Sequence, residues 1–194
     1  MIRSGFKSLS AVVLGFLLAA TAHADGASVT LHASPDPVQA GSPVSLSVDL
    51  STISDLYAWQ FTLNFDPTLL QASGVSEGAF LSTAGATFFI PGAIDNSTGV
   101  ISFNVDTLQT AIPGANGSGT LLTISFNAVA SGTSALSFGD TLALDSQGND
   151  IAVQWNSGSL TVVSTVPEPV PALMLAAGLL VVGTRLRRRA TQQA

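Results

Sequence analysis

The chain contains no cysteine, and none of its six Lys and Arg residues lies between residues 8 and 184. The first absence excludes disulfide bonds and cysteine nucleophiles. The second removes Schiff-base lysines and arginine clamps from the middle of the chain. Eleven Asp and Glu residues lie between Asp25 and Asp150, so this region cannot neutralise phosphates, and we exclude nucleic acid as a partner. Its negative field favours a cationic partner or a divalent cation.

Histidine and glutamate are almost as scarce. His32 is the only histidine after residue 24 and lies in a predicted N-terminal strand, so we interpret it as structural or surface-exposed. Glycoside hydrolysis needs two carboxylates at a set separation. Glu77 is the only glutamate of the middle region, and its candidate partners are Asp66, Asp95 and Asp106. We expect these three at strand ends or turns, where Asp forms local hydrogen bonds, so we predict no catalytic residues and no enzyme.

Residues 1–24 have the three parts of a secretory signal peptide. The positive n-region carries Arg3 and Lys7, and the apolar run extends from Leu9 to Ala20. Ala22 and Ala24 form the small-x-small cleavage signal, so we expect the mature chain to begin at residue 25. The alternative is an uncleaved anchor, although the run is shorter than the ~20 residues that span a bilayer.

Residues 164–194 contain a second targeting signal. Pro167, Glu168 and Pro169 precede an apolar run, Ala172 to Gly183, and the basic cluster that follows is Arg185, Arg187, Arg188 and Arg189. Snorkelling arginines and local thinning of the bilayer let such a short helix span the membrane. The positive-inside rule places the arginines in the cytoplasm, which agrees with export of the preceding domain. The two prolines keep Glu168 in an extended, accessible segment that a processing enzyme can grip.

The order of Pro-Glu-Pro motif, short hydrophobic helix and arginine cluster resembles the PEP-CTERM sorting signal. The resemblance implies recognition by an exosortase-type processing enzyme, and membrane attachment through the C-terminal helix until the tail is removed. It also implies export across the inner membrane to the cell surface or extracellular matrix of a Gram-negative bacterium that makes exopolysaccharide. The alternative is a plain C-terminal anchor.

Residues 25–163 form one domain of ordinary size with the period-2 alternation of β-strands. The alternation is clear at Trp59, Phe61, Leu63 and Phe65, which places these side chains on one face of a strand. Many short strands with one apolar face predict two packed antiparallel sheets, an all-β fold. The expected helix content is small, with one turn at Pro67 to Leu70. Nine segments are the predicted strands: Ser28 to Ala33, Pro43 to Leu50, Leu56 to Phe65, Thr87 to Ile90, Val100 to Val105, Gly119 to Ala128, Ala135 to Phe138, Leu142 to Leu144 and Gly158 to Val163.

Four segments in order resemble a cohesin domain, the jelly-roll β-sandwich of cellulosome scaffolds. They are Asp36 to Val44, Leu56 to Leu70, Gly119 to Phe126, and Asp145 to Asp150 with its continuation to Val162. The resemblance covers nearly the whole domain and implies a sandwich of about nine strands with a non-catalytic binding role. It does not transfer dockerin binding, because no short motif marks that face.

The segment Asp145 to Asp150 offers clustered oxygen ligands on a turn, which Ca²⁺ prefers. A structural calcium would use Asp145, Asn149 and Asp150, with Asp140 as a neighbour. The segment lacks the EF-hand spacing, and we favour a hairpin turn with positive φ at Gly148 and Asn149. No other cofactor is expected.

Two sets of residues have alternative interpretations. Tyr57 and Trp59 could form a sugar-stacking platform, but their alternation with Phe61 favours the core, which leaves Trp155 as the candidate for exposure. Asn96 and Asn116 begin glycosylation-type triplets, which we interpret as turn composition.

These observations leave three hypotheses about function. The first is an exported surface or extracellular-matrix protein whose cohesin-like domain binds an unknown surface protein without catalysis. The second is a carbohydrate-binding module that retains the protein in exopolysaccharide. The third, and the least favoured, is a glycoside hydrolase.

Overall fold

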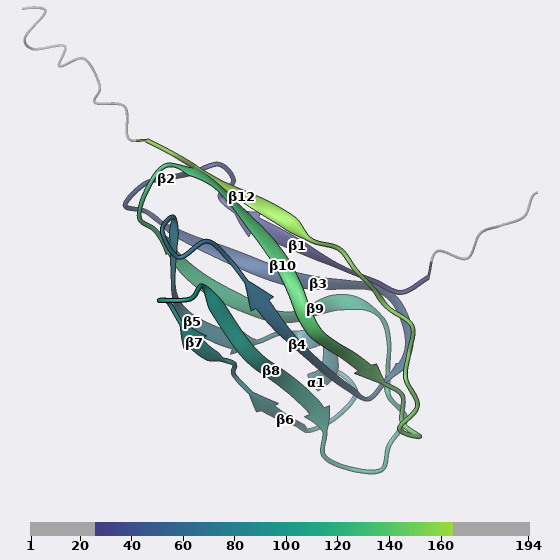
Figure 1. The fold of residues 1–194 in the computed structure, drawn as a ribbon. Helices are drawn as coiled ribbons and strands as arrows, with labels where there is room; N and C mark the ends of the chain where they lie inside the picture. Colours follow the sequence, from purple (N-terminus) through teal and green to yellow (C-terminus); the bar gives the residue numbers. More distant parts are fainter. Residues whose placement is uncertain (1–25, 165–194) are drawn as a thin grey trace, which may run out of the picture.

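The computed structural model describes residues 26–164, which form a sandwich of two β-sheets (Figure 1). The predicted signal peptide and sorting segment lie outside the described residues, including Ala22, Ala24 and the Pro167–Pro169 motif. Among residues 26–164, no helix has the length and hydropathy needed to cross a membrane.

The first sheet has five strands in the order β11-β1-β3-β9-β5. Its neighbours pair antiparallel, except that β1 and β11 are parallel. The strands are β1 (Ser28–Ser34), β3 (Pro43–Leu56), β5 (Leu70–Glu77), β9 (Ala115–Ala128) and β11 (Gln154–Trp155).

The second sheet has seven strands in the order β2-β12-β10-β4-β8-β6, and β7 also pairs with β8. It faces the viewer in Figure 1, with the first sheet behind it. A short helix, α1 (Ala79–Ser82), follows β5 and leads the chain from one sheet to the other. The strands are β2 (Val38–Gln39), β4 (Ala58–Asn64), β6 (Thr87–Ile90), β7 (Ala93–Asp95), β8 (Val100–Leu108), β10 (Gly132–Leu144) and β12 (Gly158–Val163).

The predicted all-β sandwich is confirmed, and each of the nine predicted segments overlaps a strand. Two of them are parts of one strand, because β10 continues through an irregularity between Gly139 and Leu142. The sequence pattern missed β2, β5, β7, β11 and α1. Strand β5 was missed because Ser73, Gly74 and Ser76 interrupt its apolar pattern, and only pairing with β9 makes it a strand. The predicted turn after Asp66 is present, and the Leu70 amide donates to the Asp66 carbonyl.

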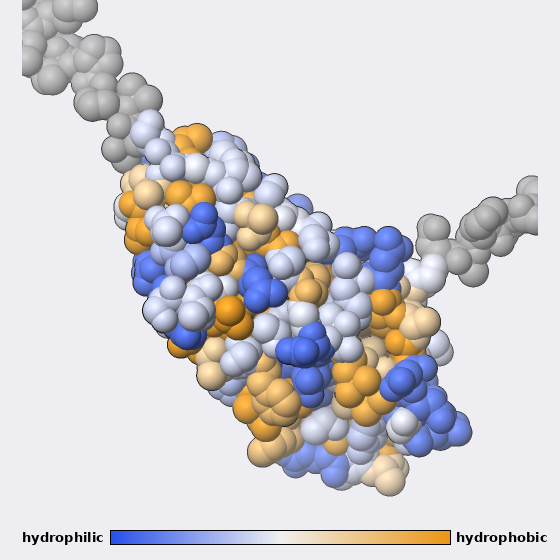
Figure 2. Space-filling model, viewed as in Figure 1, coloured by the Kyte–Doolittle hydropathy of each residue, from blue (hydrophilic) through white to orange (hydrophobic). Residues whose placement is uncertain are grey.

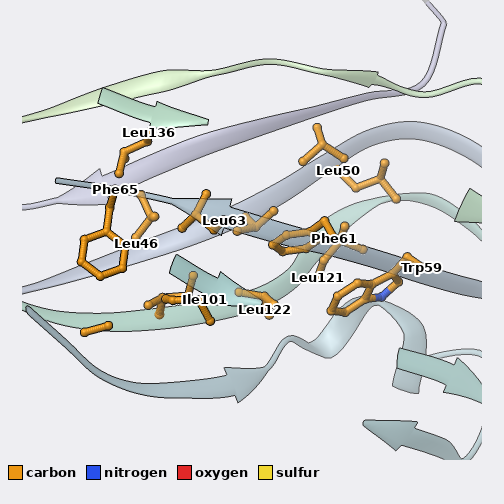
Figure 3. Packing of buried hydrophobic residues seen from close by; sticks show 14 of the residues in the cluster. Leu46, Leu50, Trp59, Phe61, Leu63, Phe65, Ile101, Leu121, Leu122 and Leu136 are labelled. Carbon is orange, nitrogen blue, oxygen red and sulfur yellow. The ribbon is translucent and has the colours of Figure 1, made fainter. Parts of the chain in front are cut away.

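The core lies between the sheets and is centred on the inward side chains of β4 (Figure 3). Trp59, Phe61 and Leu63 are at most 1 % exposed, and they meet Leu46 and Leu122 from the first sheet. The rings of Trp59 and Phe61 stack with centroids 5.4 Å apart. Burial of these large side chains is the main source of the domain's stability. The core of the described residues extends from Val29 to Val162, so residues 26–164 have a hydrophobic core of their own.

The prediction that Trp155 is exposed is wrong. Its ring lies 5.6 Å from the ring of Phe61 and 5.2 Å from that of Phe138, and it packs against the core. It comes from β11, a two-residue strand that sequence alternation cannot orient. Tyr57 also packs against the core, as predicted, and its hydroxyl donates to the Thr110 carbonyl.

Phe61→Ala tests the role of the β4 ring set. The substitution leaves a cavity beside Trp59, so we expect the free energy of unfolding to fall by about 3–5 kcal/mol. Urea unfolding of residues 26–164 measures this loss, with Gln60→Ala as the outward-facing control on the same strand, expected to change it by less than about 1 kcal/mol. Equal losses in the two variants would contradict the assignment of faces.

Candidate functional site

The outer face of the seven-stranded sheet carries an apolar row across four strands. The register places Leu142 of β10 beside Gln60 of β4, Gln60 beside Val105 of β8, and Val105 beside Ile90 of β6. Directly paired side chains on one face of a sheet lie in contact distance. The four strands therefore present a row of three aliphatic side chains interrupted by one amide.

Two phenylalanines extend this row at the edge formed by β6 and β8. Phe88 is 55 % exposed and Phe103 is 54 % exposed, while Ile90 and Leu142 are each 36 % exposed. Figure 2 shows this face, with hydrophobic residues grouped among hydrophilic ones over the region of β6 and β8. Contiguous exposed apolar groups on a soluble domain are typical of an interaction site. We define the docking face as Phe88, Ile90, Phe103, Val105 and Leu142.

Two β-bulges shape the docking face. The register of β4 with β8 shifts between Phe61 and Leu63, and Phe103 adopts a φ of 61° there. The register of β4 with β10 shifts beyond Gly139, and Asp140 has a φ of 48°. Positive φ is uncommon outside glycine and costs on the order of 1–3 kcal/mol. Such strain persists only where surrounding contacts enforce it.

Thr62 links the two bulges on the outer side of β4. Its hydroxyl donates to the Asp140 carboxylate at 3.3 Å and accepts from the Phe103 amide at 3.4 Å. The Thr62 side chain is 8 % exposed, so these bonds are shielded from water. The Thr62 hydroxyl therefore fixes the position of the Asp140 carboxylate relative to the backbone of Phe103.

Asn104 supports the Phe103 bulge from the interior. It is fully buried, and its amide nitrogen donates to the carbonyls of Phe61 and Ile101, both at 3.2 Å. Its side-chain oxygen accepts from the Gly92 amide at 3.1 Å. A Cβ on Gly92 would lie 2.5 Å from that oxygen, so glycine is required at this close approach. Asn104 thus satisfies the backbone groups that the bulge leaves without partners in the ladder.

Sequence reasoning identified none of the five docking-face residues as functional. One signal was available, since Phe88 and Phe89 are adjacent in a predicted strand and must point to opposite faces. The structure turns Phe89 toward the core and exposes Phe88. The bulges had no signal, because they depend on pairing between distant strands.

Two of the candidate acids are turn residues, as predicted. Hydrogen bonds from the hydroxyl and amide of Thr68 hold the pKa of Asp66 below its ordinary value. Hydrogen bonds from Ser97, and then from Thr98, lower the pKa of Asp95 to about 2.

The prediction for Asp106 is wrong, because Asp106 lies within β8 and faces the interior. It is 0 % exposed, and neither carboxyl oxygen has a hydrogen-bond partner. Burial, and then the nearby Glu77 carboxylate, raise the pKa of Asp106 to about 7. The carboxyl group is sealed from the surface, so Glu77 and Asp106 cannot flank a glycosidic bond.

The segment from Asp145 to Asp150 forms a turn. The Asp145 carboxylate accepts from the amides of Gln147 and Asn149 and from the Asn149 side chain. These bonds, the one from the Asn149 side chain above all, lower the pKa of Asp145. Gly148 has a φ of 81°, as predicted, whereas the predicted positive φ of Asn149 is wrong. Asp150 pairs with Leu144. Within residues 26–164 no three His, Cys, Asp or Glu side chains gather as a metal-binding group.

The other candidates have structural positions. His32 is exposed on β1, where its carbonyl accepts from the Ser47 hydroxyl. The Asn96 side chain bonds both backbone groups of Ala72, and that of Asn116 accepts from Ser54 and the Asp55 amide.

The fold and this face together define a β-sandwich binding module. The family model described as the cohesin domain matches residues 28–162, and the chain belongs to the cohesin family. Cohesin domains are non-catalytic protein-binding modules. No curated protein matches the chain.

Solved cohesins share the fold at low identity. A non-cellulosomal cohesin from Archaeoglobus fulgidus is 18 % identical, with 72 % of this chain and 92 % of that chain covered, at a TM-score of 0.58. The second type II cohesin module of an adaptor scaffoldin from Acetivibrio cellulolyticus is 17 % identical, with 74 % and 99 % covered, at 0.60. The sixth cohesin of scaffoldin B from the same organism, solved with a dockerin, is 21 % identical, with 71 % and 99 % covered, at 0.59.

Asn104→Ala tests the support of the Phe103 bulge. It leaves two carbonyls and one amide without partners, so we expect the free energy of unfolding to fall by roughly 2–4 kcal/mol. Urea unfolding measures the loss, and Asn127→Ala on the exposed face of β9 is the control, expected within about 0.5 kcal/mol of the wild type. A neutral Asn104→Ala would show that the bulge does not depend on this side chain.

Proposed function

We propose that the protein is an exported surface or extracellular-matrix protein whose cohesin domain binds a partner protein through the docking face. The observation that carries this proposal is the placement of Phe88, Ile90, Phe103 and Leu142, all exposed, on one face of one sheet. Two of these side chains lie at or beside bulges that cost conformational energy. A domain that only had to fold would gain stability from regular pairing at these positions.

The charge of the domain indicates the chemistry of the partner. Residues 26–164 contain ten of the chain's twelve acids and no Lys or Arg, so every cation at an interface must come from the partner. Asp140 presents one such carboxylate beside the docking face. We expect a partner with an apolar centre and a basic rim, since complementary charge speeds encounter and fixes orientation. Solved relatives crystallised with dockerins make a dockerin-like protein one candidate.

Site-specific photo-crosslinking tests the docking face. Residues 25–166 carrying a photo-reactive amino acid at position 103 are exposed to secreted proteins and exopolysaccharide of the host, and the products are identified by mass spectrometry. We expect one protein to crosslink from position 103 and not from position 125, which lies exposed on the opposite sheet. Phe103→Ser should weaken binding of that protein by at least about 10-fold, because central aromatic residues dominate interfaces.

Ser125→Ala is the matched control for this loss of affinity. Equal crosslinking from both positions would contradict the docking face. Capture of polysaccharide alone would favour the carbohydrate-binding alternative and overturn the proposal of a protein partner.

Sorting of the protein to the cell surface is part of the same proposal. It rests on the Pro167, Glu168 and Pro169 motif and on the arginine cluster. An exosortase-type enzyme would cleave the exported precursor near the Pro-Glu-Pro motif and release the domain from the membrane. Replacement of the three residues by alanine should therefore leave full-length precursor in the membrane fraction. Immunoblotting of membrane and surface fractions measures this, with Gln192→Ala as the control beyond the arginines. Normal release of the triple variant would contradict sorting through this motif.

A further inference from the structure

The interior of the sandwich contains an acid that its surroundings leave unsatisfied. Asp106 is 0 % exposed, and no group donates a hydrogen bond to either carboxyl oxygen. Its partner on β4 is Trp59, whose indole nitrogen is also buried without a partner, and its partner on β6 is Phe89. An isolated buried carboxylate is very unfavourable, so such a group tends to retain its proton.

No cation within the described domain can neutralise Asp106, because residues 26–164 contain no Lys or Arg. Strands β4, β6 and β9 and helix α1 carry no titratable side chain. Strand β7 carries Asp95, which lies opposite Val100 at the far end of β8. The titratable group that acts on Asp106 is Glu77, at the end of β5 in the opposite sheet, and its charge opposes ionisation.

Glu77 also forms a hydrogen bond with strand β6. The Thr87 hydroxyl donates to the Glu77 carboxylate at 2.5 Å, and Thr87 is the first residue of β6. Strand β6 lies at the edge of its sheet, where β8 is its only neighbour in the strand order. The next residue, Phe88, and Ile90 belong to the docking face. Asp106, Glu77 and Thr87 therefore connect the interior to two residues of the proposed interface.

We propose that a proton on Asp106 keeps β6 in place, and that ionisation of this carboxyl group releases the strand and with it Phe88 and Ile90 of the docking face. Ionisation places two negative charges together at the inner edge of the sandwich and draws water toward Asp106. Both effects weaken the contact of Thr87 with Glu77. The link to partner binding rests on the proposed function, whereas the proton-dependent state of β6 does not.

The direction of the pH effect follows from linkage. The pKa of Asp106 is raised to about 7 in the folded state by burial and then by Glu77, and the unfolded chain has the ordinary value of 3.8. Between these values the folded state binds the extra proton, so its stability falls as the pH rises, and this contribution is fully present below about pH 4. The exposed acids with lowered pKa values, such as Asp95, lose their contribution only at lower pH. We therefore expect the domain to be more stable at pH 5 than at pH 8.

Hydrogen exchange of residues 26–164 tests the state of β6 without a partner. After correction for intrinsic rates, we expect protection of β6 amides to fall at least about 10-fold from pH 5 to pH 8, while β3 and β9 keep theirs. The melting temperature should fall by roughly 5–10 °C over the same range. Carbon NMR of the Asp106 carboxyl group should titrate near neutral pH. A midpoint below pH 5, or equal changes in all strands, would overturn the proposal.

Two variants separate the roles of the acids. Asp106→Asn keeps the shape without the charge and should abolish the pH dependence of β6. Glu77→Gln removes the neighbouring charge, and it should move the Asp106 midpoint to lower pH by a measurable fraction of a unit. The second variant keeps the test valid if the first fails to fold. An unchanged transition in Glu77→Gln would contradict the coupling of the two groups.

Binding completes the test once the crosslinked partner is known. Its affinity for the wild-type domain should fall at least about 10-fold from pH 6 to pH 8, and its affinity for Asp106→Asn should change much less. If the protection of β6 depends on pH but the affinity does not, the assignment of the docking face is contradicted. The proposal that a proton on Asp106 keeps β6 in place is then still supported. If neither responds, the inference about Asp106 fails and the proposed function is unaffected.

Discussion

The described domain must solvate ten carboxylates without one Lys or Arg side chain. The domain therefore cannot form ion pairs with Lys or Arg of its own. Hydrogen bonds from neighbouring turns stabilise its carboxylates instead. Asp66, Asp95 and Asp145 each accept from amides or side chains two to four residues ahead. Asp55 accepts from Gly114 and Ser146, far along the chain. Each of these bonds favours the charged form and fixes a loop at the same time.

Asp106 is the exception to this arrangement, and its position explains its behaviour. Its place on β8 turns it inward between Trp59 and Phe89, where neither carboxyl oxygen has a hydrogen-bond partner. A turn carboxylate finds its partners locally, whereas a carboxyl group on the inner face of a sheet depends on the opposite sheet. The opposite sheet supplies Glu77, which has the same charge. This unsatisfied carboxyl group thus lies within β8, one of the strands that carry the docking face.

The docking face and the core depend on the same irregularities of β8 and β10. A regular β8 would alternate through Phe103 and Asn104 without a kink, and the buried amide of Asn104 would lose its backbone partners. The Thr62 hydroxyl then connects the Phe103 amide to the Asp140 carboxylate across the outer side of β4. Polar groups that are fully bonded specify one geometry, which a binding surface with exposed rings requires. The cohesin fold provides the two sheets, and these few residues provide the surface.

The sequence by itself determined the class of fold, because alternation along Trp59, Phe61 and Leu63 places large apolar side chains on one face whatever the pairing. It also determined the absence of cations and the local turns at Asp66 and Asp95, which need only nearby residues. Only the tertiary structure decided the rest. Strand register set the bulge that exposes Phe103, and packing of two distant strands brought Glu77 to Asp106. Such contacts join residues that no local period relates, so their chemistry appears only when the sheets are in place.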